Sequence, residues 1–118
     1  MMFKRASEMS HVFTEHQMGG EGTCEVINIL EGEELHNASP FVGVTRVPVG
    51  ATIGMHKHVG DFETYYILRG KARVTVEDTT VDLEPGDATQ CEDGESHCIA
   101  NIGDEELVYI SVKMFSRN

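Results

Sequence analysis

The stretch Gly50–Gly70, GATIGMHKHVGDFETYYILRG, combines the patterning of β-strands with three side chains that suit a buried strand face poorly. Two histidines, His56 and His58, lie one residue apart, and Glu63 follows five residues later. Side chains at i and i+2 of a strand share one face, so we expect both imidazoles to point the same way. A hairpin turn at Val59–Asp61 would bring Glu63 back beside them. Two imidazoles and a carboxylate on one surface form a half-shell for a divalent metal ion.

A second stretch, Gly86–Asn101, GDATQCEDGESHCIAN, offers the remaining ligand. His97 begins a predicted strand after a glycine-containing turn, and adding it gives three imidazoles and one carboxylate. A His-x-His pair alone often occurs by chance on an exposed strand face. The histidine in this second stretch is what favours a metal site over that simpler explanation.

The rest of the chain has the pattern of an all-β fold, in which β-branched or apolar runs alternate with turns. We expect about eight strands, within residues 23–30, 41–47, 51–58, 64–70, 71–78, 79–87, 97–103 and 105–115. The turn at Arg69–Lys71 predicts a hairpin, because Gly70 tolerates a positive φ that few other residues adopt. Strands separated by turns every eight to twelve residues indicate a sandwich or barrel.

The chain is predicted to be a single domain with an N-terminal extension. Residues 1–22 are weakly patterned and end in the turn-rich GGEGT, so we expect an arm there, either a short helix or irregular, followed by a barrel domain over residues 23–118. A length of 118 residues is sufficient for one hydrophobic core.

The composition limits which binding partners and which cellular compartment we expect for this chain. The 20 acidic and 9 basic residues give a formal charge of −11, which repels phosphate backbones and anionic lipids. We therefore expect no nucleic-acid partner and no membrane association. Three cysteines and an N-terminus without a continuous apolar segment favour reduced thiols in the cytoplasm. Cys91 and Cys98 are interpreted as small buried hydrophobes rather than zinc ligands.

The two stretches together resemble the paired motifs of small single-domain cupins. The first motif corresponds to Gly50, His56, His58, Glu63 and Gly70, and the second to Gly86, Gly94, His97 and Asn101. One departure is Glu92, where the family usually has proline, and it concerns the rigidity of the turn before His97. The resemblance implies a double-stranded β-helix, or jelly-roll barrel, of two antiparallel sheets with a metal site near one open end. It implies His56, His58, Glu63 and His97 as the ligands.

The expected function is that of a metal-dependent enzyme acting on a small polar or anionic metabolite, by isomerase, lyase or dioxygenase chemistry. The alternative is a module that binds or senses a small sugar-like ligand without turnover. Nitrogen and oxygen ligands do not distinguish among Zn, Mn, Fe, Ni and Cu as the divalent transition metal. No catalytic residue is assigned.

Two residues are candidates for substrate binding. Tyr65 shares a strand face with Glu63, although a tyrosine that caps the barrel core is the more common explanation of such a position. Arg46 would anchor a carboxylate if its strand turned it inward, and otherwise lies on the surface. Tyr66, Cys98 and Lys113 are weaker candidates for proton transfer. Exposed sheet edges, together with the family resemblance, lead us to expect a homodimer.

Overall fold

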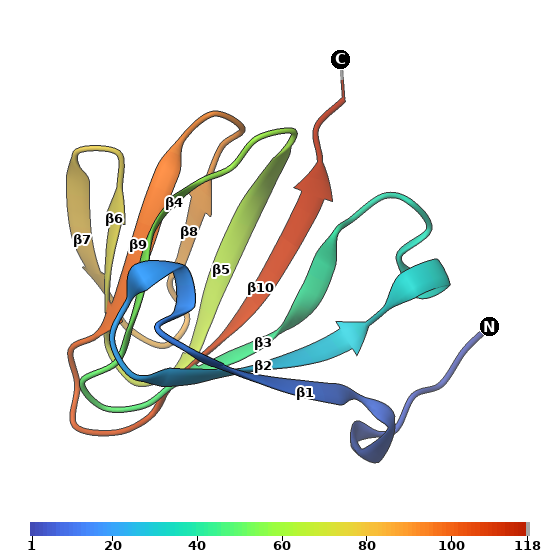
Figure 1. Ribbon diagram of the computed structural model, residues 1–118, viewed down its shortest axis with the longest axis horizontal. Coiled ribbons are helices and arrows are strands. Elements are labelled where there is room, and N and C mark those ends of the chain that lie inside the picture. Colours follow the sequence, from blue (N-terminus) through green and yellow to red (C-terminus); the bar gives the residue numbers. More distant parts are fainter. Residues whose placement is uncertain (118) are drawn as a thin grey trace.

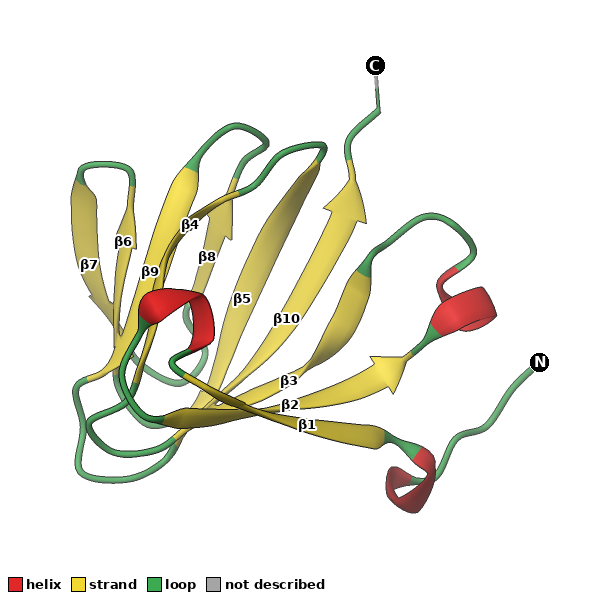
Figure 2. Cartoon of the chain, viewed as in Figure 1, coloured by secondary structure: helices red, strands yellow, loops and turns green. Residues whose placement is uncertain are grey.

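The computed structural model describes residues 1–117 and shows two antiparallel β-sheets facing each other (Figure 1). The strands are β1 (Ser10–Glu15), β2 (Thr23–Leu30), β3 (Phe41–Val47), β4 (Thr52–Lys57), β5 (Asp61–Arg69), β6 (Ala72–Val76), β7 (Thr79–Leu83), β8 (Ala88–Cys91), β9 (Ser96–Asn101) and β10 (Leu107–Phe115). Helical structure in this part of the chain is confined to three short 3₁₀ turns, η1 (Ala6–Glu8), η2 (Gln17–Gly19) and η3 (Gly32–Leu35) (Figure 2). The predicted all-β jelly-roll fold is confirmed. None of these helices has the length and apolar character needed to cross a bilayer.

The strand order explains how distant segments meet. One sheet has the order β1-β2-β3-β10-β5-β8 and the other β4-β9-β6-β7. Consecutive strands β4 and β5 therefore lie in different sheets, and so do β5 and β6. Both predicted hairpins are wrong: Gly70 has the expected positive φ of 87°, but the chain crosses there between sheets. A positive φ reverses the chain without determining whether the next strand pairs with the previous one.

The N-terminal segment contributes a strand of its own. Residues 10–15, inside the segment expected to be an arm, form β1 and pair antiparallel with β2 from Ser10↔Asn28 to Glu15↔Thr23. The short strand β8 was also not predicted, because four residues with mixed polarity carry little strand signal. The division into an arm and a barrel domain stays a prediction, as do the homodimer and the cytoplasmic location.

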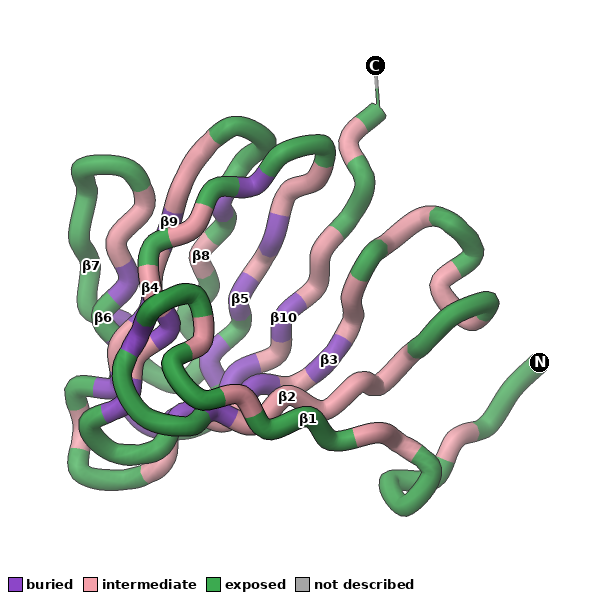
Figure 3. Tube along the Cα trace, in the orientation of Figure 1, coloured by how far each residue is buried: buried purple, intermediate pink, exposed green. Residues whose placement is uncertain are grey.

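The core lies between the two sheets and changes from apolar to polar along the barrel. On β5 the inward side chains are Ile67, Tyr65 and Glu63 in that spatial order, all of them buried. On the neighbouring β10, Tyr109, Ser111 and Lys113 pair with these three residues in the same order. Both strands carry buried positions along their length (Figure 3). An apolar base thus supports a polar mouth, and the functional side chains lie in the mouth.

Candidate metal centre

Four side chains from three strands and one turn converge at this mouth. His56 lies on β4, His58 follows β4, Glu63 lies on β5 and His97 on β9. Their ligating atoms all lie within 4.8 Å of one another. His97 Nε2 is 2.9 Å from His58 Nε2 and 3.1 Å from His56 Nε2. Glu63 Oε1 is 3.1 Å from the Nε2 atoms of both His58 and His97.

An irregularity in β4 helps to aim His56 inward. The register between β4 and β9 shifts between Ile53 and His56. Because of this shift, Ile53 and His56 both face the interior although they are three positions apart. After the shift the alternation continues: Met55 and Lys57 are exposed, while His58 is buried. The predicted shared orientation of His56 and His58 is therefore observed. Glu63 reaches them from the opposite sheet rather than through a hairpin.

The outer nitrogens of two histidines are held by hydrogen bonds. His56 Nδ1 lies 2.8 Å from the carbonyl oxygen of Gly54, and His58 Nδ1 lies 2.7 Å from Asp61 Oδ1. Because these oxygens accept, each Nδ1 carries the proton and each Nε2 presents a lone pair to the cluster. Metal-binding histidines characteristically have such partners, which fix the ring and its tautomer. Asp61 was not predicted, although its position three residues after His58 was a usable signal.

The cluster is a group of acceptors without enough donors. Glu63 and His97 are almost completely buried, with 4% and 1% of their surface exposed. Glu63 Oε1 and His97 Nδ1 have no hydrogen-bond partner. A buried carboxylate facing imidazole lone pairs is costly unless a cation joins them. For ligand bonds of about 2.1 Å, neighbouring corners of an octahedron are about 3.0 Å apart, close to the separations seen here. The residues present therefore fit a divalent metal ion.

Electrostatics favour the metal-binding forms of two of these residues, Glu63 and His56. Burial alone would raise the pKa of Glu63, but its close contact with His97, the hydrogen bond from Ser111 and the positive charge of Lys113 hold its pKa below the ordinary value. The Ser111 hydroxyl donates to Glu63 Oε2. Burial lowers the pKa of His56, and this outweighs the opposing effect of the Gly54 carbonyl. Near neutral pH, Glu63 is thus ionised and His56 neutral.

The two predicted substrate-binding residues lie in different places. Tyr65 is buried, and its hydroxyl lies 3.3 Å from His97 Nε2. Burial raises the pKa of Tyr65 well above its usual value, so the phenol stays protonated. Arg46 lies on the other face of β3 from inward-facing Thr45, and it contacts Glu106 at 3.2 Å. The structure brings Tyr65 to the cluster and leaves Arg46 outside it.

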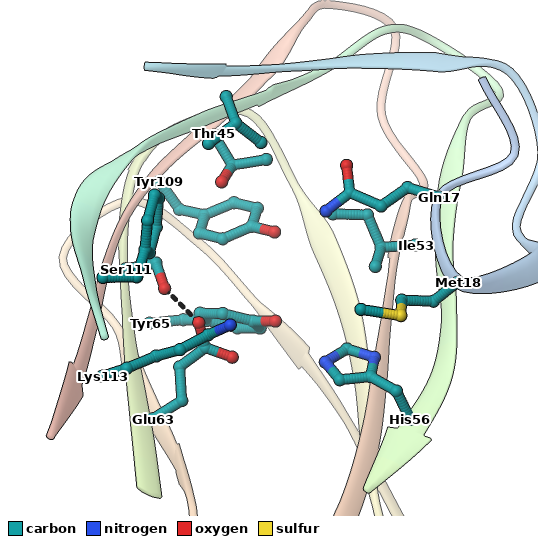
Figure 4. A pocket seen from close by; sticks show the side chains of 12 residues that line it. Gln17, Met18, Thr45, Ile53, His56, Glu63, Tyr65, Tyr109, Ser111 and Lys113 are labelled. Atoms are coloured by element: carbon teal, nitrogen blue, oxygen red, sulfur yellow. Dashed lines mark hydrogen bonds between the residues drawn. The ribbon is translucent and has the colours of Figure 1, made fainter. Parts of the chain in front are cut away.

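A cavity of about 150 Å³ opens beside the cluster. His56, Glu63 and Tyr65 form part of its wall, and Lys113 and Gln17 add polar groups from two other directions (Figure 4). The remaining lining residues are Met18, Val26, Phe41, Thr45, Ile53, Tyr109 and Ser111. Sequence reasoning missed Gln17 and Ser111 among these. The hydroxyl of Ser111 in an otherwise apolar strand, two residues from Lys113, was a signal for an inward polar face.

Fold and site together define a small jelly-roll protein with a candidate divalent-metal centre in the barrel mouth. The family model for the cupin domain matches residues 43–113. The chain therefore belongs to the cupin family. It is 34% identical over 111 residues to the oxalate-binding protein of Thermotoga maritima, covering 94% of this chain and 92% of that protein. It is also 36% identical over 61 residues to an uncharacterized protein of Methanocaldococcus jannaschii, about half of each chain (52% and 49%).

Solved structures agree with this assignment. The crystal structure of a predicted oxalate decarboxylase from Thermotoga maritima superposes with a TM-score of 0.92 at 33% identity, covering 98% of this chain and 100% of that one. The protein TT1209 from Thermus thermophilus superposes with a TM-score of 0.72 at 20% identity, covering 98% of both chains. The cupin domain of Cnp3 from Schizosaccharomyces pombe gives 0.71 at 24% identity, covering 79% and 61%. The last two similarities concern the fold alone.

Proposed function

We propose that this protein binds a divalent transition-metal ion through His56, His58, Glu63 and His97, and binds a small dicarboxylate of the oxalate class beside it. One observation carries the proposal. Four ligating atoms, including the unpartnered Glu63 Oε1, face one another, and two of the residues that carry them, His56 and Glu63, line a cavity. When bound, the ion supplies a Lewis-acidic centre that attracts carboxylate oxygens.

The cavity favours a small anion. Its volume of about 150 Å³ is below the roughly 300–1,000 Å³ of pockets for drug-sized ligands, so it suits a ligand of few non-hydrogen atoms. Lys113 pairs directly with Glu63 across neighbouring strands and lines the same cavity. Its ammonium group compensates part of the negative charge that an anion brings into an acidic protein. The name of the Thermotoga maritima relative, an oxalate-binding protein, supports the choice of ligand.

Binding without turnover is the better supported form of this function. A catalytic mechanism needs a group that exchanges a proton and is not already occupied as a ligand. Among the described residues that line the cavity, His56 and Glu63 belong to the ligand set, and burial raises the pKa of both Tyr65 and Tyr109. These phenols therefore donate hydrogen bonds but do not cycle protons near neutral pH. Lys113 remains as the one ionisable side chain free to act.

The experiment has two stages. Metal content is first measured by elemental mass spectrometry for the wild type, His58→Ala and His97→Ala, with His36→Asn as a matched control. His36 is an exposed histidine outside the cluster, and its φ of 52° is one that asparagine tolerates. We expect near-stoichiometric metal in the wild type and the control and loss in the two alanine variants. Equal metal in all four proteins would contradict the proposed centre.

The second stage titrates oxalate into the metal-loaded and metal-free wild type by calorimetry. We expect binding by the loaded protein alone. The loaded protein is then incubated with oxalate, and release of carbon dioxide is followed, with none expected. Oxalate binding that is equal with and without metal would refute a ligand site at the ion, and sustained carbon dioxide release would replace binding by the enzymatic alternative.

A further inference from the structure

We propose that Gln17 is a specificity-determining residue: its side-chain amide hydrogen-bonds the second carboxylate of a dicarboxylate held at the metal centre. This inference rests on the function proposed above and deepens it. Gln17 lies in η2, outside both sequence motifs and inside the segment that the sequence suggested was only an arm. It is the feature of the cavity that the metal site itself does not explain.

The first observation is an unsatisfied amide at the cavity. Gln17 points into the cavity from the wall opposite Lys113, Tyr109 and Ser111 (Figure 4). Its Oε1 is buried and has no hydrogen-bond partner. Buried polar atoms are nearly always paired in native proteins, so an unpaired one calls for an explanation. A half-turn of the amide exchanges its oxygen and nitrogen, so the group can present N–H donors to an anion.

The second observation is the fixed position of η2. Both neighbours of Gln17 have left-handed backbones, with φ of 52° at His16 and 53° at Met18. Non-glycine residues rarely adopt this conformation, so the surrounding structure must hold the backbone of η2 in it. It sets the direction in which the Gln17 side chain leaves the chain.

The third observation is how η2 is attached. A Cβ atom added to Gly20 would collide with the carbonyl oxygen of Thr52, and one added to Gly54 would collide with that of Met18. The two backbones can approach this closely because neither position carries a side chain. Reciprocal hydrogen bonds of 2.9 Å join Glu21 and Thr52 at the same place. The backbone that carries Gln17 is therefore held in place before any ligand arrives, which reduces the entropic cost of binding.

The chemistry of a neutral amide suits a dicarboxylate. Lys113 already supplies a positive charge on the opposite wall, and a glutamine adds hydrogen-bond donors without adding charge. An analogue with a methyl group in place of one oxygen of the second carboxylate would leave the amide facing that methyl group without an acceptor. Sites built to hydrogen-bond a ligand group discriminate strongly against ligands that lack it. Gln17 should thus distinguish oxalate from pyruvate, which has a similar size but one carboxylate.

The test uses the full chain loaded with metal. Gln17→Met keeps the length of the side chain and removes its donors, while Gln17→Glu turns them into a negative charge. Gln90→Met is the matched control, because Gln90 is exposed on β8 and lines no part of this cavity. For each protein we measure metal content, dissociation constants for oxalate and pyruvate by calorimetry, and the melting temperature of the metal-free form.

The expected result is selective. Gln17→Met should keep its metal content and its metal-free melting temperature, and should bind oxalate about ten- to a hundredfold more weakly, the range for a lost hydrogen bond to a charged group. Its affinity for pyruvate should stay that of the wild type. Gln17→Glu should lose measurable oxalate binding, and Gln90→Met should match the wild type throughout.

Two results would overturn the inference while leaving the proposed function intact. One is a wild-type affinity for oxalate in Gln17→Met. The other is a parallel loss for oxalate and pyruvate together with a lower metal-free melting temperature, which would mark a structural role. A loaded wild type that fails to bind oxalate would instead refute the proposed function, and the role of Gln17 with it.

Discussion

The ring of Tyr65 is stacked on the imidazole of His97, with centroids 4.9 Å apart and an angle of 17° between the planes. This contact joins β5 of one sheet to β9 of the other. His56 and His58 are oriented by hydrogen bonds at Nδ1, whereas His97 Nδ1 has no such partner. Stacking on Tyr65 thus performs for His97 the orienting role that Gly54 and Asp61 perform for the other two imidazoles.

Replacement of Tyr65 should separate this orienting role from the role of the hydroxyl. Tyr65→Phe keeps the stacked ring, so we expect metal affinity close to that of the wild type. Tyr65→Leu removes the stacking and should weaken metal binding by about 10–100-fold, the usual cost of losing a group that orients a ligand. Competition with a chromogenic chelator measures both affinities. Equal metal affinity in the leucine variant would show that His97 is oriented by something else.

Asp61 should matter for metal binding although it is not a ligand. Asp61→Ala removes the acceptor that holds His58 Nδ1 at 2.7 Å. We expect a loss of about 10–100-fold in metal affinity, with Asp78→Ala, an exposed turn residue, as the control. The same chelator competition applies. If both variants bind metal like the wild type, the hydrogen bond to His58 has no orienting function.

Removal of the metal should loosen the barrel. The ligands come from both sheets, so an ion bound by all four stabilises the folded state and has no comparable site in the unfolded chain. A free metal concentration of 100 times the dissociation constant contributes about 2.7 kcal/mol, which corresponds to a shift in melting temperature of about 10 °C for a domain of this size. Calorimetric melting with and without a chelator tests this. His97→Ala should show no such shift, and a wild type whose melting is insensitive to chelation would contradict the prediction.

The buried cysteines should be unreactive in the folded protein. Burial, together with nearby carboxylates such as Glu95, raises the pKa of Cys91 to about 11. Burial also raises the pKa of Cys24. At pH 8 both groups are therefore protonated, and the thiolate that reacts with alkylating agents is scarce. Intact-mass analysis after iodoacetamide treatment should show at most one label, on the partly exposed Cys98, and three labels after denaturation. Rapid native labelling of Cys91 would show that this strand opens readily.

The four candidate ligands could be named from the sequence because they stand in two motifs whose spacing resembles that of the cupin motifs. The pair His56 and His58 follows strand alternation, and Tyr65 follows from Glu63 by the same rule. Alternation does not say which of two faces is inward, however. Arg46 and Thr45 are neighbours on β3, and only the packed barrel determines that Thr45 faces the cavity.

The pairing of strands could not be predicted from turns. Gly70 has the φ that a hairpin would need, yet β5 pairs with β10 and β8 instead of β6. Sheet membership is decided by burial of side chains far apart in the sequence, which a turn residue does not encode. The position of Gln17 was missed for a related reason. Its segment has no periodic pattern, and what fixes it is a backbone contact between Gly20 and Gly54.

The close approach of Gly20 and Gly54 attaches to the barrel a segment that contains none of the four candidate ligands. A chain begun at Thr23, the predicted start of the barrel domain, would retain every ligating side chain and both motifs, yet it would lack the wall that carries Gln17. If both proposals hold, ion binding and anion selectivity depend on different stretches of sequence. Substitutions in the first twenty residues should then change anion selectivity and leave the ion-binding residues unchanged.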